Sequence, residues 1–272
     1  MKEIYRVAAV SCTAEVNNWR TNLHTVETWA KRAAEQQVKL ILFPELSVTG
    51  YSTNGDLECC ADGHEGVERL ALLAQKLQLG IAAGMAWRDS KDGQIYLAHG
   101  IWLPTGERFL YYKSHLGARE ESCFAAGSYL PVFALPGITV GIQMCLEHHF
   151  PDIAQTLVLR GAQLILCPHA TPRLSPDQRR DSWHIALRAR AYDNCAYILA
   201  ANLQGDNSRG LRYPGGAIAV DPAGKVLAQD FSGDEALIIA DLDLTQVIDT
   251  RTTPQGMCRR FYAPFRRKEL YE

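Results

Sequence analysis

The sequence predicts an α/β fold in which two β-sheets pack face to face and helices cover the outside of each sheet. Short apolar segments alternate with amphipathic ones along the 272 residues. The apolar segments run for five to eight residues and are rich in Val and Ile, which is typical of strands buried on both faces. LILFPE at 40–45 is echoed by LILCPH at 164–169, which indicates two similar α/β halves. No Pro/Gly/Ser-rich linker separates the halves, so we expect a single domain.

The expected strands coincide with the apolar segments, and turn residues end several of them. The PTG turn at 104–106 ends one strand, and DPAG at 221–224 ends a similar one. In chain order, the strands are expected at residues 7–11, 38–44, 80–88, 98–103, 109–113, 139–145, 163–168, 197–203, 217–220 and 236–242.

Four amphipathic helices are expected between these strands, at residues 18–36, 66–79, 151–160 and 176–194. One face of the first helix is apolar, being formed by Leu23, Val26, Trp29, Ala30 and Ala33. In the fourth helix, Arg190 falls on the apolar stripe of Trp183 and Leu187, a position that favours a structural ion pair.

Composition and charge exclude several classes of partner. The chain has 28 Lys and Arg against 30 Asp and Glu, a net charge of −2, so nothing favours nucleic acid or anionic membrane. No apolar run approaches the roughly 20 residues of a membrane span, and the charged N-terminus lacks a secretory signal. The eight cysteines show no C-x-x-C pair and no zinc-site spacing. We therefore expect a reduced, cytoplasmic protein.

Three polar residues stand out because each follows a predicted buried strand. Glu45 follows KLILFP, Lys113 ends FLYYK, and Cys145 ends TVGIQMC. Functional groups collect at the carboxyl ends of strands in α/β folds, so these three side chains are candidates for one pocket. The common motifs of serine hydrolases, zinc peptidases and nucleotide-binding proteins are absent from the sequence.

This set of side chains suits nucleophilic catalysis by a thiol. A free thiol has a pKa of about 8.5, so it needs a base, and a carboxylate can serve as one. A lysine beside the carboxylate can stabilise the oxyanion of a tetrahedral intermediate, with the backbone N–H of Leu146 as a second donor. A Cys–His pair using His148 or His149 is the competing interpretation. A metal site formed by Cys145 and these histidines lacks a fourth ligand at a suitable spacing.

The segments around these residues resemble the three signatures of the nitrilase superfamily, the carbon–nitrogen hydrolases. The segments are PELSVTGY, YYKSHL and GIQMCLEHHFPD, and their order and separation also fit that family. The resemblance extends through ARAYDN at 189–194, ANLQG at 201–205 and GGAIAVDPAGKVL at 215–227. It implies a four-layer α-β-β-α sandwich that usually dimerises, with no cofactor and no metal.

The resemblance also implies roles for individual residues. Glu45 would be the base, Lys113 the oxyanion cation and Cys145 the nucleophile. A second glutamate normally lies in E-x-x-x-F-x-x-G, which places it at Glu120, with Glu121 as the alternative. Two positions depart from the family pattern. Leu146 stands where Tyr or Trp is usual, which favours amides over nitriles as substrates, and alanine follows GG at 215–216, where the family often has serine.

We therefore expect a carbon–nitrogen hydrolase domain at residues 1–255 and a basic, aromatic tail at 256–272 that packs on a surface such as another subunit. The expected reaction is hydrolysis of a small linear amide or N-carbamoyl compound through a cysteine thioester, releasing ammonia or an amine. A nitrilase and a non-catalytic interaction protein of the same fold are the alternatives. The expected partners are the amide substrate and a second copy of the chain, with no nucleic acid and no membrane. The candidate substrate-binding residues are Leu146, His149, His169, Thr171 and Trp183.

Overall fold

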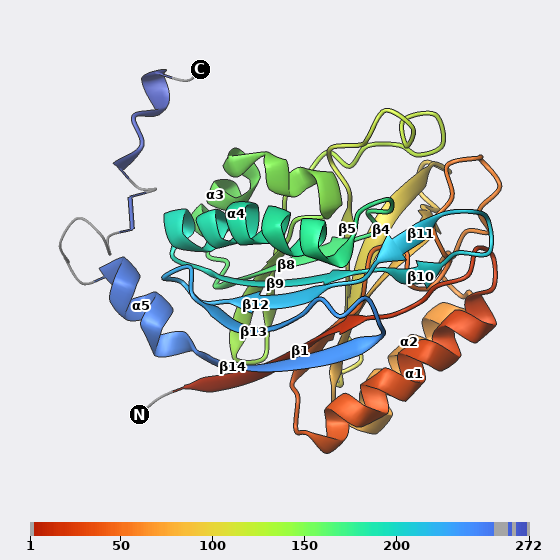
Figure 1. Ribbon diagram of the computed structural model, residues 1–272, viewed down its shortest axis with the longest axis horizontal. Coiled ribbons are helices and arrows are strands. Elements are labelled where there is room, and N and C mark those ends of the chain that lie inside the picture. The colour runs from red at the N-terminus through yellow and green to blue at the C-terminus, as the bar shows by residue number, and fades with distance from the viewer. Residues whose placement is uncertain (1–2, 253–260, 263–264, 271–272) are drawn as a thin grey trace.

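The computed structural model, which describes residues 3–252, 261–262 and 265–270, confirms the predicted α/β sandwich. Two six-stranded sheets face each other, with a pair of helices outside each sheet (Figure 1). Three separate apolar clusters fill the spaces between the four layers. One lies between the sheets and the others lie between each sheet and its helices, so the central strands are buried on both faces.

The first sheet has the strand order β14-β1-β2-β3-β4-β5. Strands β1, β2 and β3 run parallel, while β4, β5 and β14 pair antiparallel to their neighbours. The strand bounds are β1 Ile4–Ser11, β2 Leu40–Leu42, β3 Gly80–Arg88, β4 Ile95–Trp102, β5 Arg108–Tyr112 and β14 Ala236–Asp243.

The second sheet has the order β13-β12-β9-β8-β7-β6 and repeats this plan. Strands β7, β8 and β9 run parallel, and the outer strands pair antiparallel. Strands β2 and β8, which carry the echoed segments, each lie in the middle of a parallel trio. The bounds are β6 Val132–Leu135, β7 Ile138–Ile142, β8 Leu164–His169, β9 Tyr197–Asn202, β12 Ala217–Val220 and β13 Val226–Asp230, with a small ribbon of β10 Gln204–Asp206 and β11 Arg212–Pro214.

The helices begin at side chains that can cap them. The Asn18 side chain accepts from the Thr21 N–H at the start of α1, and Ser175 and Gln178 form a capping box at the start of α4. Helices α1 and α2 cover the first sheet, and α3 and α4 cover the second (Figure 1). Their bounds are α1 Trp19–Glu35, α2 Glu65–Leu77, α3 Pro151–Leu159, α4 Pro176–Asn194 and α5 Leu244–Thr252.

The elements that sequence periodicity does not predict lie at the margins of the fold. Strands β6 and β13 are the edges of the second sheet, and β13 has no fully buried residue. Helix α5 buries only two of its nine residues. Two expected strands are shorter than predicted, because β2 ends at Leu42 and β7 at Ile142 before the chain turns. Those turns carry Glu45 and Cys145.

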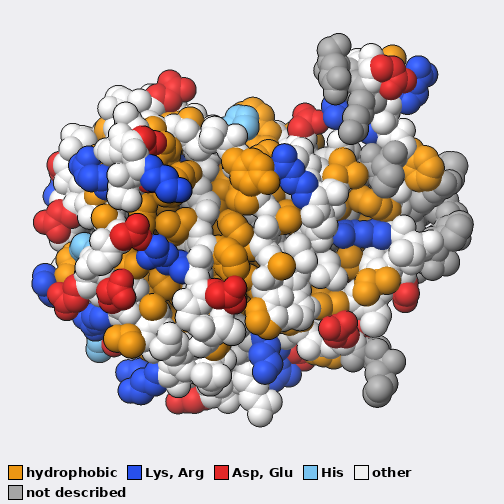
Figure 2. All heavy atoms as spheres, turned by 180° about the vertical axis from the view of Figure 1, so that it is seen from behind, with side chains coloured by type: hydrophobic (Ala, Val, Ile, Leu, Met, Phe, Trp, Pro, Cys, Tyr) orange, Lys and Arg blue, Asp and Glu red, His pale blue; other side chains and the backbone are white. Residues whose placement is uncertain are grey.

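One face of the molecule carries Lys, Arg, Asp and Glu side chains interspersed among apolar ones (Figure 2). Within the described residues, no helix combines the length and apolar character needed to cross a bilayer.

The expected domain boundary at 255 and much of the tail lie outside the described residues. Where the tail is described, the Phe261 ring lies 5.3 Å from the Arg251 guanidinium, and residues 265–270 stand away from the sheets (Figure 1).

His99 on β4 is a buried polar residue away from these margins. Its side chain is fully enclosed, and neither ring nitrogen has a hydrogen-bond partner among the residues that the structure describes. Burial lowers the pKa of His99 to about 3. The imidazole is therefore neutral in the folded protein at any ordinary pH.

Candidate active site

The three strand-end residues meet at the edge where the parallel strands of both sheets end. Lys113 follows β5 and is 1% exposed, and its Nζ lies 2.9 Å from Oε1 of Glu45. The same Nζ lies 2.9 Å from both carboxylate oxygens of Glu120. The backbone N–H of Ala170, just after β8, donates to Glu45 Oε2 at 3.1 Å. The site is therefore assembled across the two sheets, with one buried cation between two carboxylates.

The turn that carries Glu45 lies very close to β3. An ideal Cβ built on Gly84 would lie 2.4 Å from the Leu46 nitrogen and 3.1 Å from the Glu45 Cα. Real side chains do not tolerate such distances, so glycine at this position lets the turn approach the sheet. The Ser47 hydroxyl then accepts from the Gly84 N–H at 3.2 Å. These contacts fix the depth at which the Glu45 carboxylate is buried.

Cys145 sits on a sharp turn between β7 and the short 3₁₀ helix η1, Cys145–His149. Its φ is +41°, a left-handed conformation that is uncommon for a non-glycine residue and that clusters at functional sites. The Cys145 Sγ lies 3.2 Å from the Thr171 hydroxyl. Thr171 is itself held by Asn202, whose side-chain oxygen accepts its backbone N–H at 2.9 Å.

Burial and charge shift the pKa values of this site in ways that suit proton transfer. Burial raises the pKa of the Cys145 thiol to about 11, and the Glu45 charge raises it further than Lys113 lowers it. Burial also raises the pKa of Glu45 to about 6, although Lys113 opposes that rise. Burial alone would lower the pKa of Lys113, but Glu45, Cys145 and Glu120 raise it well above its ordinary value. At pH 7 the site thus holds a neutral thiol beside an ionised carboxylate and an ammonium.

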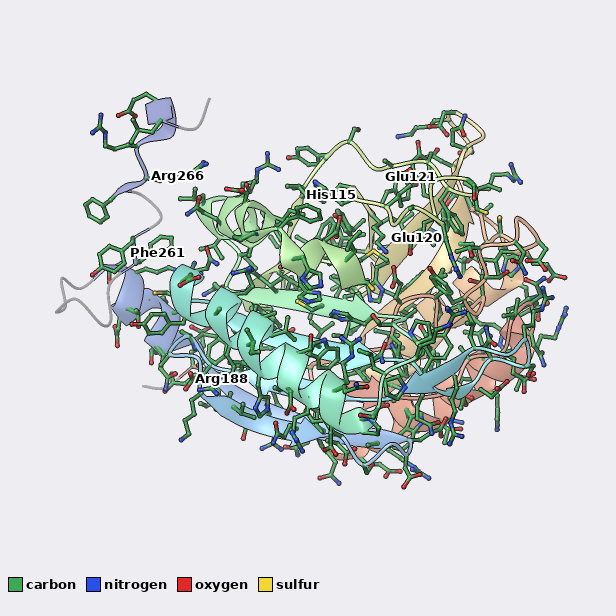
Figure 3. The ribbon with its side chains drawn as sticks, turned by 45° about the horizontal axis from the view of Figure 1, so that its top comes forward. His115, Glu120, Glu121, Arg188, Phe261 and Arg266 are labelled. Carbon is green, nitrogen blue, oxygen red and sulfur yellow. The ribbon has the colours of Figure 1, made fainter. Side chains whose placement is uncertain are left out.

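Glu120 rather than Glu121 faces this cluster. Glu120 is 5% exposed, and it also accepts from the Tyr51 hydroxyl at 3.1 Å and from the Gly117 N–H at 2.7 Å. Glu121 is exposed, and Figure 3 shows it farther from the centre of the molecule than Glu120. Tyr51 is the last residue of the PELSVTGY segment, but the sequence analysis assigned it no role in the site.

A third buried carboxylate, Glu147, connects the lysine loop to the cysteine turn. Its Oε1 accepts from the Tyr111 hydroxyl at 2.6 Å and from both the N–H and the hydroxyl of Ser114, at 2.8 and 2.6 Å. Its Oε2 accepts from the Met144 N–H at 2.7 Å. Glu147 therefore fixes the positions of Lys113 and Cys145 relative to each other. It lies within the cysteine signature, but nothing in the sequence alone assigned it this function.

The five candidate substrate-binding residues occupy different environments. Thr171 contacts the thiol, Leu146 is partly exposed beside it, and His149 is exposed. His169 and Trp183 are fully buried, with ring centroids 4.8 Å apart. His169 Nδ1 lies 2.8 Å from the Cys167 carbonyl and therefore donates to it. The structure thus places Thr171 and Leu146 at the thiol and His149 on the surface.

The geometry gives little support to the two competing interpretations of Cys145, a Cys–His pair and a metal site. His148 is buried, and its Nδ1 lies against the Cys145 carbonyl oxygen rather than the sulfur. Burial lowers the pKa of His148 to about 4. Among the described residues, no group of three or more His, Cys, Asp or Glu side chains is arranged to hold a metal ion.

Arg190 forms the ion pair that its position on the apolar stripe predicted, and it also donates to a backbone carbonyl. Its guanidinium is 14% exposed and lies 3.8 Å from the Asp193 carboxylate, while its Nε donates to the His148 carbonyl at 3.2 Å. The fully inward arginine of α4 is a different residue, Arg179, which is 2% exposed on the same face as Trp183.

Comparison with known proteins agrees with this geometry. The family model described as carbon-nitrogen hydrolase matches residues 6–252. A "Hydrolase in pqqF 5'region" of Pseudomonas protegens is 34% identical over 275 residues, covering 98% of this chain and 90% of that protein. An (R)-stereoselective amidase of Pseudomonas sp. is 27% identical over 208 residues, covering 76% and 74%.

Among solved structures, a mutant of the amidase from Nesterenkonia sp. AN1 superposes with a TM-score of 0.80 and 25% identity, over 98% of both chains. In that structure acrylamide has added to the active-site cysteine. The fold, the three signatures and the family match agree over nearly the whole chain. The protein therefore belongs to the carbon–nitrogen hydrolase family, as an amidase-like member of the nitrilase superfamily.

Proposed function

We propose that the protein hydrolyses the C–N bond of a small linear amide or N-carbamoyl compound through a thioester on Cys145. The observation that carries the proposal is the position of Lys113, a buried cation bound to Glu45 and Glu120 and close to the thiol. Burying charges costs free energy that even close pairing need not recover, so a buried cluster of this kind is better explained by chemistry than by stability. The amidase similarity supports an amide as the electrophile.

In the acylation step, the Cys145 sulfur attacks the carbonyl carbon while Glu45 takes the thiol proton. A carboxylate with a pKa of about 6 is ionised at pH 7 and can accept that proton. The Lys113 ammonium and the Leu146 N–H stabilise the oxyanion as it forms. Glu45 then passes the proton to the nitrogen, and ammonia or an amine leaves.

In the deacylation step, a water molecule replaces the amine. Glu45 removes a proton from the water as it attacks the thioester carbonyl, and the thiolate leaves and is reprotonated. Glu120 stays bound to Lys113 throughout and orients it. In this scheme Glu45 is the only group that moves protons, and Glu120 fixes the position of the cation.

The proposal is tested by measuring ammonia release from a panel of linear amides, ureido acids and nitriles. We expect turnover of an amide or ureido acid, abolished by iodoacetamide and unaffected by EDTA. Faster release from nitriles would favour the nitrilase alternative. Release from none of the compounds would favour the non-catalytic interaction protein.

We further propose that the protein assembles as a homodimer or a larger homo-oligomer. Exposed apolar side chains near the C-terminus support this: Ile248, Phe265 and Leu270 are 48%, 60% and 63% exposed. Apolar side chains gathered at one end of a chain are typical of subunit contacts. Sedimentation at micromolar concentration should give at least twice the monomer mass, and a monomer would refute the proposal.

A further inference from the structure

His148, on the 3₁₀ helix η1 that begins at Cys145, is a buried titratable residue that the proposed mechanism does not use. The residue is 3% exposed, and its Nε2 is enclosed without a hydrogen-bond partner among the described residues. A buried acceptor that stays unpaired is unfavourable. The reason for an imidazole at this position therefore lies in the contacts of its other nitrogen, Nδ1.

The hydrogen bonds around His148 identify the nitrogen that carries its proton. His169 Nδ1 lies 2.8 Å from the Cys167 carbonyl oxygen, which can only accept, so the proton of His169 is on Nδ1. Burial lowers the pKa of His169 well below its ordinary value and that of His148 to about 4, so both rings are neutral at pH 7. His169 Nε2 is then an acceptor, and it lies 3.2 Å from His148 Nδ1. His148 therefore carries its proton on Nδ1.

The contact of His148 with Cys145 leads to the same tautomer. His148 Nδ1 lies against the carbonyl oxygen of Cys145, and a carbonyl oxygen can only accept. Two acceptors from different segments, the His169 ring and the Cys145 carbonyl, thus face one N–H. A directed series of hydrogen bonds runs from β8 through the two imidazoles and ends at the backbone of the nucleophile.

The carbonyl that His148 contacts belongs to the peptide bond between Cys145 and Leu146. In a planar trans peptide the C=O and the N–H point in opposite directions, so a group that fixes the carbonyl also fixes the N–H. In the part of the chain that the structure describes, nothing accepts from the Leu146 N–H, which leaves it available to an oxyanion. A carbonyl that accepts a hydrogen bond also polarises its peptide, which strengthens the N–H as a donor.

The cysteine turn needs support of this kind, and His148 is itself held firmly enough to give it. Cys145 has a φ of +41°, a sparsely populated conformation that persists only where surrounding contacts impose it. The His148 ring centroid lies 5.1 Å from that of His169 on β8. The Nε of Arg190, on α4, donates to the His148 carbonyl at 3.2 Å. Strand β8 and helix α4 thus both support the turn through His148.

We propose that His148 is a positioning residue for the oxyanion site, whose Nδ1–H holds the Cys145 carbonyl so that the Leu146 N–H points at the oxyanion. This inference rests on the proposed function, to which it adds a residue that acts through the backbone and not on the substrate. The oxyanion forms only as the carbonyl is attacked. Loss of the His148 donor should therefore lower kcat and leave KM nearly unchanged.

The first experiment compares two variants of nearly equal side-chain size, His148→Asn and His148→Leu. Asparagine can place its amide nitrogen where His148 has Nδ1, whereas leucine has no donor. Removing an oxyanion donor outright costs about 10²–10³ in kcat. Because His148→Leu misdirects the donor without removing it, we expect kcat to fall about 10- to 100-fold, with KM within about threefold of wild type. His148→Asn should keep kcat within about fivefold of wild type.

The control for removing a buried imidazole is His99→Leu. His99 is fully enclosed on β4, and its ring nitrogens bond to no group in the described ranges. Its replacement should leave kcat within about threefold of wild type, because no donor to the cysteine turn is lost. A His148→Leu variant with the same kcat as His99→Leu would overturn the inference.

The second experiment measures the oxyanion site without turnover, using butanal. The Cys145 sulfur bonds to the aldehyde carbon, the thiol proton moves to Glu45, and the electron pair of the C=O π bond moves to the oxygen. The dissociation constant is read from protection of Cys145 against iodoacetamide, followed by peptide mass spectrometry. Binding should weaken about tenfold or more in His148→Leu and less than about threefold in His148→Asn. The alkylation rate without butanal should stay the same, because alkylation builds no charge on a carbonyl oxygen.

The outcomes separate this inference from the proposed function. Weaker butanal binding in His148→Leu alone would support the inference even if wild type released no ammonia from any amide. Amide turnover with equal butanal binding in wild type and His148→Leu would overturn the inference and leave the proposed function standing. No protection of wild type by butanal would also overturn it, and so would a fall in the alkylation rate as large as the loss of butanal affinity.

A measurement on wild type decides the matter where His148→Leu fails to fold. ¹⁵N NMR of protein labelled at histidine distinguishes a protonated ring nitrogen from a bare one. A proton on Nδ1 of His148 at pH 7 would support the inference. A proton on Nε2 would leave Nδ1 with nothing to donate to the Cys145 carbonyl, and the inference would be wrong.

Discussion

Replacing Glu45 with glutamine should abolish most turnover while leaving the fold intact. A glutamine oxygen can still accept from the Ala170 N–H or from Lys113, so the packing of the turn is preserved. What the amide lacks is the ability to take a proton. In the proposed mechanism that proton must leave the Cys145 thiol in the first step and a water molecule in the second.

The expected loss of kcat/KM follows from the high pKa of the Cys145 thiol. With a pKa of about 11, Cys145 is ionised in about one molecule in 10⁴ at pH 7 without help. Removing the Glu45 charge also removes one cause of that high pKa, so the thiolate fraction in the variant rises somewhat. A general base is typically worth about 10²–10⁴ in rate. We therefore expect kcat/KM to fall by about 10³.

The pH profile gives a second, independent readout. Glu45 must be ionised to act as a base, and its pKa is about 6. The wild-type kcat/KM should therefore rise with pH to a plateau above pH 7, and at pH 5 it should be about one tenth of the plateau value. Glu45→Gln should lack this plateau, because its residual rate follows the thiolate fraction of Cys145, which keeps rising with pH up to the high pKa of the thiol.

The assay is steady-state ammonia release across pH 4.5–9, with the amide that wild type hydrolyses best. Alkylating reagents are unsuitable as the readout, since they report whether the thiol is accessible rather than whether a base is present. Glu121→Gln is the matched control, because Glu121 is exposed, and it should behave as wild type. A Glu45→Gln variant that keeps more than a tenth of the wild-type rate, or whose rate still levels off above pH 7, would refute the reasoning.

The remaining predictions concern the thiol, the second glutamate and the buried histidine. Cys145→Ala should abolish ammonia release. Cys167→Ala, in the core beneath β8, should change the melting temperature more than the rate. Comparable ammonia release by the two variants would exclude covalent catalysis at Cys145. Glu120→Gln should turn over more slowly but still accumulate an acyl adduct detectable by mass spectrometry, because Glu120 mainly orients Lys113. An adduct found in Glu45→Gln instead would mean that the roles of the two glutamates are exchanged. His99 has a pKa of about 3 when folded and an ordinary value near 6.5 when unfolded, so the unfolded chain binds the extra proton between these values and stability falls as pH drops. Chemical denaturation should show that His99→Leu removes about 2 kcal/mol of the stability lost between pH 7 and pH 5, and an unchanged pH dependence would contradict this.

The central strands and the reacting residues could be predicted from the sequence because each leaves a local pattern. Strands β3 and β12 were predicted with their observed bounds, since strands buried on both faces read as continuous apolar runs. Glu45, Lys113 and Cys145 each follow such a run, where a polar residue is conspicuous. The echo between β2 and β8 likewise indicated two halves, because equivalent central positions select similar apolar residues.

Edge elements and the partners of buried charges could not be predicted, because they depend on contacts between distant segments. Strand β13 lacks a buried residue, so no periodic signal marks it. The sequence placed Arg190 on the buried stripe of α4, but the most buried arginine of that helix is Arg179, which packs against Trp183 and, from another element, Gly216. Glu147 looked like one acid among several until the fold brought the lysine loop against it. The sequence therefore determines which groups are available for chemistry, whereas tertiary packing decides which of them are buried, paired or left without a partner.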